Sequence, residues 1–385
     1  MTLNLLIAPS GFKESLSADA VADCIETGIL RALTDVHIQK APLADGGEGF
    51  TKALVASTGG MICPITVTGP VGKPVAAFYG VMGGKDPKTV VLEMAAAAGL
   101  RLVPSDARDP LRTTTYGVGE LIRAALNDGA ERILIGCGDS GTNDGGAGMA
   151  QALGIRLMDS SYHDIGPGGA ELLRIQQIDM TNRDPRLNRV RIDVACNWKN
   201  VLCGPRGVAR VYGPQKGGSP ETIERLEAAL EHYAEMISKA LGIDVREMAG
   251  GGASGGLGSG LYAFLGASLH PWQDIVLQYL EFDSLLQKAD LVITAEGTID
   301  GQTLSGKIPA EVSRRAKRYS IPVVALAGSV GKDARINLEH GIDAYASILD
   351  APCSLSEAIT NTATLLSNAA EQMIRLLKVG QTLKG

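Results

Sequence analysis

The sequence has no long apolar run and no excess of positive charge. Every hydrophobic segment is far shorter than the roughly 20 residues that a membrane-spanning helix needs. The 36 Lys and Arg are outnumbered by 42 Asp and Glu, and the formal net charge of -6 argues against a nucleic-acid-binding surface. The first residues lack the basic region of a secretion signal and lead straight to Pro9. We therefore expect a cytoplasmic protein that binds neither membranes nor nucleic acids.

Cysteine and histidine are also scarce, and neither is spaced to hold a metal. The five histidines show no metal-ligand spacing. The six cysteines are scattered and form no C-x-x-C pair, which in a chain of 385 residues favours free thiols over a disulfide framework. These cysteines are Cys24, Cys63, Cys137, Cys196, Cys203 and Cys353.

The remaining composition is that of a globular protein, with 45% hydrophobic and 20% charged residues. Short apolar runs alternate with amphipathic helical patterns, which favours parallel sheets covered by helices. We therefore predict an α/β fold. The predicted strands are 3–8, 38–43, 90–93, 133–135, 192–195, 291–295, 323–327 and 344–348, and the clearest helices are 18–33, 118–127, 220–241 and 309–319.

One segment breaks this alternation. Residues 65–84 combine valines, glycines and turn residues, and they resemble antiparallel strands more than βα units. This change of pattern marks a candidate domain boundary.

The loop after the strand 133–135 gives the strongest indication of chemistry. Residues 136–149 read GCGDSGTNDGGAGM. Glycine lets backbone N–H groups approach a ligand closely, and the carboxylates of Asp139 and Asp144 are available for a metal or a proton. We interpret the loop as a site for small-molecule chemistry on phosphates. The alternative is a turn used only for tight packing.

Polar groups also follow the other predicted strands. In an open α/β sheet, ligands bind beyond the carboxyl ends of the strands, so we expect these segments to converge on one cleft. The segments are 9–16, 44–49, Glu93, 136–149, 196–200 and 296–300.

Each candidate residue also has a simpler explanation. Lys13, between a strand and a helix start, would contact an anion or would be a solvated cation. Asp45 and Glu48, flanked by glycines, would belong to the site or would only face a helix N-terminus. Asp300 would bind a metal or a proton, or would cap a turn.

A second glycine cluster, residues 250–260, reads GGGASGGLGSG and leads into a helical pattern. Free N–H groups and the helix dipole make such a loop a candidate anion site. We therefore predict that it cradles nucleotide phosphates, with a flexible domain linker as the alternative. Lys216, beside glycines in residues 212–218, is a further candidate anion contact.

Together these motifs resemble the bacterial glycerate kinase type 1 family, in the same order and along nearly the whole chain. The resemblance implies phosphorylation of D-glycerate by ATP with Mg²⁺, most often giving 2-phosphoglycerate. The partner would be a small hydroxy acid, and we expect a monomer or a homodimer. The motifs are APSGFKESL (8–16), ADGGEG (44–49), EMAAA (93–97), TNDGGAGM (142–149), YGPQKG (212–217) and EGTID (296–300).

The resemblance also implies two α/β domains with the active site between them. We expect residues 1–74 together with 286–385 to form a discontinuous, Rossmann-like domain with a doubly wound parallel sheet. Residues 75–285 would form an inserted α/β domain with a mixed sheet.

The chain departs from the family pattern inside these motifs. Ser10 and Asn197 replace aspartates, Thr298 replaces an arginine, and Asp139 is gained. Losing an arginine removes a bidentate carboxylate clamp, and an amide replaces a base or a metal ligand. Two alternatives therefore stay open: a kinase of a related or larger hydroxy acid, and a catalytically weakened metabolite-binding protein. An oxidoreductase is disfavoured because no G-x-G-x-x-G follows the first strand.

Phosphoryl transfer needs groups that hold the triphosphate, bind Mg²⁺ and accept the hydroxyl proton. We assign catalysis to Lys13, Asp45 and Asp144. Either Asp45 or Asp144 is the base that accepts the hydroxyl proton, and the sequence does not decide between them. Glu296 and Asp300 are the predicted metal ligands. The predicted substrate-binding residues are Ser10, Lys13, Asp45, Glu48, Asn143, Asn197 and Lys216, and the predicted nucleotide-binding residues are Gly251, Ser254, Gly255, Gly256, Gly258 and Glu296.

Overall fold

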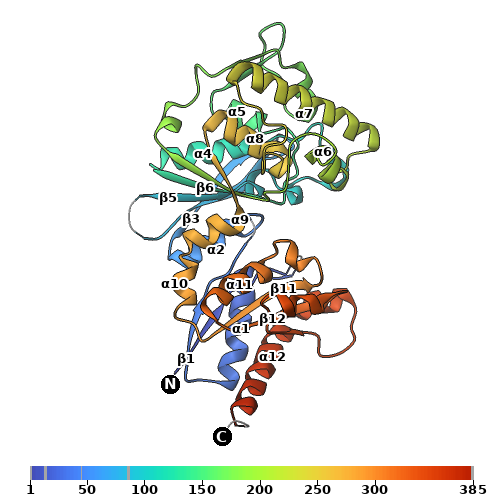
Figure 1. The fold of residues 1–385 in the computed structure, drawn as a ribbon. Coiled ribbons are helices and arrows are strands. Elements are labelled where there is room, and N and C mark those ends of the chain that lie inside the picture. Colours follow the sequence, from blue (N-terminus) through green and yellow to red (C-terminus); the bar gives the residue numbers. More distant parts are fainter. Residues whose placement is uncertain (1, 13–14, 45, 85–86, 383–385) are drawn as a thin grey trace. The chain divides into compact units, whose positions relative to one another are not determined.

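The computed structural model describes residues 2–12, 15–44, 46–84 and 87–382. The chain divides into two compact units (Figure 1). Unit 1 is formed by Met1–Ala44 and Val276–Gly385, and unit 2 by Asp45–Ile275. The helix α9 (Trp272–Tyr279) crosses the division.

The division differs from the predicted boundaries at residues 74 and 286. Residues 46–74 belong to unit 2 because β3 (Met61–Thr68) pairs with β4 (Pro74–Val81), and β4 pairs with β5 (Thr89–Glu93) of the same sheet. The change of pattern at residues 65–84 is therefore an antiparallel pair inside unit 2, as its sequence suggested, and not a domain boundary. Residues 276–285 belong to unit 1 with α10 (Phe282–Leu286).

Unit 1 contains a five-stranded sheet in which all neighbouring strands are parallel. Its order is β13-β12-β11-β1-β2. The strands predicted at 3–8, 291–295 and 323–327 lie in this one parallel sheet, as the discontinuous domain requires, since Leu5 lies opposite Leu291 and Val292 opposite Val323. The strands are β1 (Leu3–Ile7), β2 (Val36–Lys40), β11 (Leu291–Ile299), β12 (Val323–Val330) and β13 (Ala344–Ser347).

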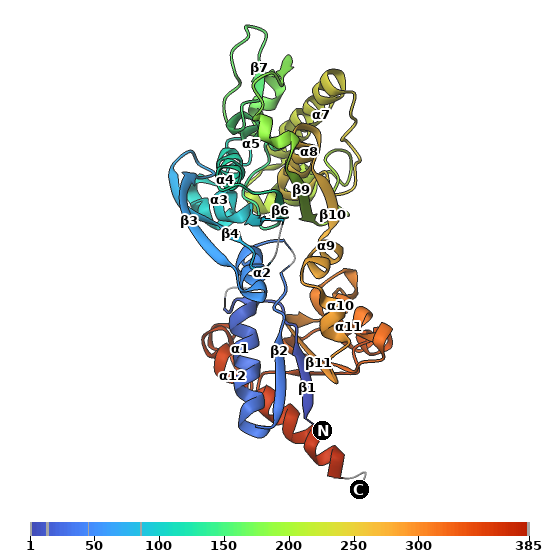
Figure 2. The same cartoon turned by 90° about the vertical axis from the view of Figure 1, so that its left-hand side faces the viewer.

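Helices cover both faces of this sheet. Figures 1 and 2 show α1 (Ala18–Ala32) and α12 (Leu355–Thr382) side by side on one face, with α11 (Ile308–Ala316) on the other. Buried side chains of β1 and β11 pack with those of α1 and α12 in one apolar core. The doubly wound parallel sheet expected from the alternating pattern is therefore present.

Unit 2 contains a mixed six-stranded sheet of order β10-β9-β6-β5-β4-β3. The strands β5, β6, β9 and β10 are parallel, and β4 and β3 are antiparallel additions at one side. A separate antiparallel pair joins β7 (Arg156–Met158) to β8 (Gln177–Asp179). The remaining strands are β6 (Arg132–Cys137), β9 (Arg191–Cys196) and β10 (Ser268–Pro271).

The two faces of this sheet carry different helices. Phe50 of α2 lies against Gly136 on one face. The other face contributes Leu92, Ile135 and Val194 to a core shared with α4, α5, α7 and α8. The helices of unit 2 are α2 (Phe50–Thr58), α3 (Ala95–Ala98), α4 (Tyr116–Asn127), α5 (Ala147–Ala152), α6 (Val208–Tyr212), α7 (Pro220–Leu241) and α8 (Ala253–Leu265).

The bounds of α7 follow from its sequence. The side chain of Ser219 accepts a hydrogen bond from the Thr222 N–H at 3.2 Å, and Pro220 occupies the first turn, where no N–H is needed. Gly242 ends the helix with φ of 72°, the left-handed conformation that glycine adopts without cost. The predicted range 220–241 is therefore confirmed.

Several elements were not predicted from the sequence, namely α12, β10 and the β7–β8 pair. Among the residues that the structure describes, none of the helices is long and apolar enough to cross a membrane.

Candidate active site

The loop after β6 is held by Asp144, which lies fully inside unit 2. Its Oδ2 accepts hydrogen bonds from the Thr115 N–H at 2.8 Å, the Thr115 hydroxyl at 2.9 Å and the Gly148 N–H at 3.2 Å. Its Oδ1 accepts one from the Gly146 N–H at 3.1 Å. Burial raises the pKa of Asp144, while these hydrogen bonds oppose the shift. The carboxylate thus connects the start of α5 to the start of α4.

Lys216 also contacts the loop after β6. It ends the short 3₁₀ helix η5 (Pro214–Lys216), and its side chain is buried, with only 3% of the residue exposed. The amine donates hydrogen bonds to Ser140 Oγ at 2.9 Å and to the Thr142 carbonyl oxygen at 2.7 Å. Burial lowers the pKa of Lys216 to about 7, and the charge of Asp144 opposes this shift.

The position of Lys216 depends on the glycine that follows it. Gly217 has φ of 92°, and a Cβ there would lie 2.4 Å from the Arg108 carbonyl oxygen. Only glycine allows the backbone at residue 217 to come this close to Arg108. The last glycine of the YGPQKG motif therefore sets where the backbone of the neighbouring Lys216 lies.

Two further side chains of the loop are buried without hydrogen-bond partners. Asn143 is 0% exposed, and neither its amide oxygen nor its amide nitrogen has a partner among the described residues. The same holds for the Thr142 hydroxyl. Because buried polar groups in native proteins are nearly always satisfied, these atoms mark a place where a polar ligand or water belongs.

The second glycine cluster packs against this loop and is fully buried. A Cβ at Gly255 would lie 1.8 Å from the Thr142 carbonyl oxygen, and one at Gly258 would lie 2.3 Å from the Gly250 carbonyl oxygen. Backbone N–H groups of Gly251 and Gly252 already donate to Met248 and Asn200 carbonyls. These glycines therefore serve close backbone packing in the structure. Their predicted role as a nucleotide cradle, with Gly251, Ser254, Gly255, Gly256 and Gly258, stays a prediction that this packing disfavours.

The residues around the start of α2 form a second polar group in unit 2. Glu93, at the end of β5, accepts hydrogen bonds from the Gly49 N–H at 3.3 Å and the Thr51 N–H at 2.9 Å. Glu48 pairs with Arg101 at 2.6 Å, and its N–H donates to Asp139 Oδ2 at 3.0 Å. The gained carboxylate Asp139 therefore holds the segment of Glu48 against the loop after β6.

Asn197 lies in an exposed turn after β9. Its Oδ1 accepts a hydrogen bond from the Lys199 N–H at 3.1 Å, and the turn contacts the glycine cluster through a Gly250 N–H to Trp198 carbonyl bond of 3.1 Å. The predicted substrate role of Asn197 stays a prediction.

In unit 1 the predicted residues gather at the carboxyl end of β11. The Ser10 hydroxyl donates to the Ala295 carbonyl oxygen at 3.0 Å and so ties the exit of β1 to β11. Glu296 lies within β11, and Asp300 follows directly after it. Thr298 is half-buried and shares a 2.9 Å hydrogen bond with Ser329 of β12.

The turn of Asp300 is fixed by its neighbours. Its Oδ1 accepts a hydrogen bond from the Gln302 N–H at 2.9 Å and lies 3.6 Å from the amine of Lys307. The buried amide of Asn337 donates to the Asp300 carbonyl oxygen at 2.9 Å. The sequence assigned no role to Lys307 or Asn337, because their contact with Asp300 is made only in the folded chain.

The donor set at this strand end fits Mg²⁺. Mg²⁺ takes oxygen ligands and in kinases commonly uses one or two carboxylates, with substrate phosphates and water completing its shell. Glu296 and Asp300 supply two such carboxylates from one strand exit. No group of three or more potential metal ligands occurs among the described residues, so a cage made wholly of protein is absent there.

Two predicted catalytic residues, Lys13 and Asp45, lie outside the described residues. Of the others, the structure brings Asp144, Asn143 and Lys216 together in unit 2, and Ser10, Glu296 and Asp300 to one sheet edge in unit 1. Ser140 and Thr115 were missed. A signal for Thr115 was present in the run Thr113–Thr115 before the helix α4, where hydroxyls commonly bond to neighbouring backbone.

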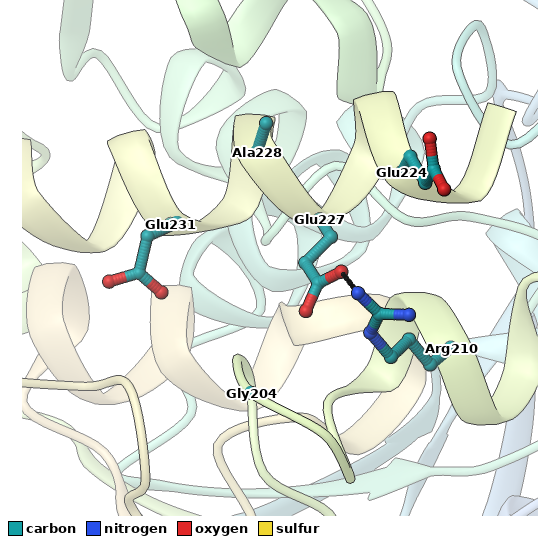
Figure 3. Close-up of a pocket in the computed structure, with 6 residues that line it drawn as sticks. All are labelled: Gly204, Arg210, Glu224, Glu227, Ala228 and Glu231. Atoms are coloured by element: carbon teal, nitrogen blue, oxygen red, sulfur yellow. Dashed lines mark ion pairs between the residues drawn. The ribbon is translucent and has the colours of Figure 1, made fainter. Parts of the chain in front are cut away.

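A surface pocket of about 420 Å³ lies elsewhere in unit 2 (Figure 3). It is lined by three glutamates of α7 and by Arg210, which forms an ion pair with Glu227. None of the predicted site residues lines it, and its acidic wall does not suit a phosphate. Its lining residues are Gly204, Arg210, Glu224, Glu227, Ala228 and Glu231.

Comparison with known proteins identifies the family. The model of the glycerate kinase family matches residues 5–378, nearly the whole chain. The chain belongs to the glycerate kinase family. It is 48% identical over 381 residues to a glycerate kinase of Bacillus subtilis (strain 168), with 99% of each chain covered.

Other glycerate kinase family relatives agree. A glycerate 2-kinase of Escherichia coli (strain K12) is 46% identical over 378 residues, covering 98% of this chain and 99% of the relative. A crystal structure from Salmonella typhimurium LT2, assigned as glycerate kinase 2, has a TM-score of 0.87 and 48% identity, with 99% of this chain and 100% of that chain covered. The alternatives of a different hydroxy acid or a weakened binding protein are therefore not favoured, despite Ser10, Asn197 and Thr298.

Proposed function

We propose that this chain is a glycerate kinase that transfers the terminal phosphoryl group of ATP to a hydroxyl of D-glycerate, giving 2-phosphoglycerate. The observation that carries this proposal is the match to curated glycerate kinases over 98% or more of the chain. The buried polar groups at the carboxyl end of the unit 2 sheet support it, since ligands of α/β proteins bind at such edges.

The substrate end is proposed to lie at the loop after β6. Lys216 and Asn143 offer a buried amine and a buried amide without a full set of partners. Both groups suit a small acid that carries a carboxylate and hydroxyls. Ser10, Lys13, Glu48 and Asn197 complete the proposed substrate set.

Asp45 is the proposed acceptor of the hydroxyl proton. The carboxylate of Asp144 already accepts four hydrogen bonds, three at Oδ2 and one at Oδ1. This occupancy supports a positioning role for Asp144 and leaves Asp45 as the proposed base. Lys13 is the proposed phosphate contact.

The proposed metal ligands are Glu296 and Asp300, with Glu296 also near the nucleotide. Mg²⁺ bound there would neutralise charge on the nucleotide phosphates. The amine of Lys307 lies 3.6 Å from Asp300 Oδ1 and forms an ion pair with it.

A cytoplasmic monomer or homodimer is the proposed form of the protein. All six cysteines are free, which supports a reducing compartment.

Product analysis tests the proposal. The chain is incubated with ATP, Mg²⁺ and D-glycerate, and the phosphoglycerate formed is identified by ³¹P NMR against 2- and 3-phosphoglycerate standards. The proposal expects the 2-isomer. Formation of the 3-isomer would overturn the assigned position, and absence of any phosphoglycerate would overturn the activity.

A further inference from the structure

The amine of Lys216 has an incomplete set of partners. A lysine ammonium carries three hydrogens. In the described residues the amine has two acceptors, Ser140 Oγ and the Thr142 carbonyl oxygen. Both acceptors are neutral, and one further donor position is left for a ligand.

The positive charge of this amine is also poorly compensated. Among the described residues the amine forms no ion pair, and both of its hydrogen-bond acceptors are neutral. The titratable group whose charge acts on the amine is Asp144, on the loop that the amine contacts. The carboxylate of Asp144 is already held by four other donors.

A buried ammonium without an adjacent anion is costly, because burial removes its hydration. Burial accordingly lowers the pKa of the amine to about 7, so above this pH most of the amine is neutral. An anion that entered beside it would restore the charged form.

The neighbouring groups match an incoming hydroxy acid. The Thr142 hydroxyl and both polar atoms of the Asn143 amide are buried and lack partners in the described residues. The carbonyl oxygen of Thr142 accepts a hydrogen bond from the amine, so these unpaired groups lie on the segment that the amine contacts. An amide and a hydroxyl are suitable partners for the hydroxyls of a substrate whose carboxylate reaches the amine.

We propose that binding of D-glycerate is coupled to proton uptake by Lys216: the substrate carboxylate takes the third donor position, and the neutral amine becomes an ammonium. The proton comes from the solvent, so no further reactant is needed. This inference rests on the proposed function and deepens it, since it names the group that recognises the carboxylate and the charge change that accompanies recognition.

Isothermal titration calorimetry of the full chain tests the coupling. D-glycerate is titrated at pH 8 in phosphate and in Tris buffer, whose ionisation heats differ, and the difference gives the number of protons taken up. We expect close to one proton per D-glycerate, because an amine with a pKa of about 7 is mostly neutral at pH 8. Lys216→Arg keeps a permanent charge, so it should bind D-glycerate without proton uptake.

Two controls accompany this titration. Lys239→Met removes an exposed lysine of α7 and should leave proton uptake unchanged. ATP titrated alone should give the same proton exchange in the wild type and in Lys216→Arg. Lys216→Met serves as a second variant if the larger guanidinium prevents folding, and it should lose at least tenfold in affinity for D-glycerate.

Three results would overturn the inference: binding of D-glycerate by the wild type without proton uptake, equal uptake by Lys216→Arg, or a difference that appears with ATP instead of D-glycerate. A parallel ADP-release assay separates this failure from that of the proposed function. A chain that phosphorylates D-glycerate but takes up no proton loses only this inference. A chain that neither binds nor phosphorylates D-glycerate loses both.

Discussion

The amine of Lys216 donates a 2.7 Å hydrogen bond to the carbonyl oxygen of Thr142, which lies far away in the sequence. Two motifs of the chain, YGPQKG and TNDGGAGM, thereby meet at one buried contact. The same carbonyl oxygen also faces Gly255 of the second glycine cluster. Three segments that looked like separate ligand loops in the sequence are thus parts of one packed polar cluster in unit 2.

The pH dependence of stability should report the burial of Lys216. Its pKa is about 7 in the folded chain, below its ordinary value of 10.5, so between these values the unfolded state binds more protons. Stability relative to Lys216→Met should therefore rise with pH from about 7 to 10, by up to about 1.4 kcal/mol per pH unit. Urea unfolding of both proteins across this range measures the difference, and parallel curves would contradict the buried neutral amine.

Asp144 should contribute mainly to stability. Asp144→Asn leaves a buried N–H donor unsatisfied and is expected to lower the free energy of unfolding by about 3 kcal/mol. The matched control Asp139→Asn, at an exposed aspartate of the same loop, should stay within about 0.5 kcal/mol of the wild type. Urea unfolding measures both.

The turnover of Asp144→Asn, compared with that of Asp45→Asn, separates the two candidate bases. Asp45→Asn is expected to lower kcat by at least about 100-fold, the usual scale of general acid–base catalysis. If instead Asp144→Asn folds with normal stability and loses kcat while Asp45→Asn does not, Asp144 is the base and the present assignment is wrong.

The sequence was sufficient for elements whose signals are local. The helix α7 has a capping serine, a first-turn proline and a terminal glycine, and its predicted bounds are those of the structure. The strands β1, β11 and β12 were predicted from their apolar runs, and strand–helix alternation predicted that they lie in a parallel sheet, as they do. By contrast, α12 was not predicted: most of its residues are exposed, although Leu365, Leu366, Ala370 and Ile374 are buried at helical spacing.

The site could be predicted only as a set of segments. Glycines that bind a phosphate and glycines that admit another backbone have the same sequence signature. What distinguishes them is the group that approaches, and for Gly255 that group is the Thr142 carbonyl oxygen, contributed by a distant segment. The same holds for Lys307, whose partner Asp300 becomes its neighbour only through the turn after β11.

Glycine substitution tests the packing role of the second cluster. Gly255→Ala combines a positive φ of 72° with a Cβ 1.8 Å from a backbone oxygen, so we expect a loss of more than about 4 kcal/mol or failure to fold. Gly266→Ala has a similar φ of 69° but meets nothing within 4 Å, so it should cost only about 1 kcal/mol of backbone strain. Thermal unfolding compares them. Equal stability of the two variants would show that residue 255 has free space, as a ligand cradle would require.

Replacing the proposed metal ligands should change the requirement for Mg²⁺. Glu296→Gln and Asp300→Asn are each expected to raise the Mg²⁺ concentration for half-maximal activity at least tenfold, equivalent to about 1.4 kcal/mol of binding free energy. Glu339→Gln, an exposed carboxylate of unit 1, serves as the control and should leave the Mg²⁺ titration unchanged. A lower kcat at an unaltered Mg²⁺ requirement would remove both residues from the metal site.

The substrate itself is the central claim, and a coupled ADP-release assay over three- to six-carbon hydroxy acids tests it most directly. The account predicts that D-glycerate has the highest kcat/KM of the panel, above about 10⁴ M⁻¹s⁻¹, within the ordinary range of enzymes. This would show that Asn197 and Thr298 are compatible with the glycerate site of the family. A larger hydroxy acid turned over at least tenfold better than D-glycerate, or no ADP release with any acid, would contradict the account.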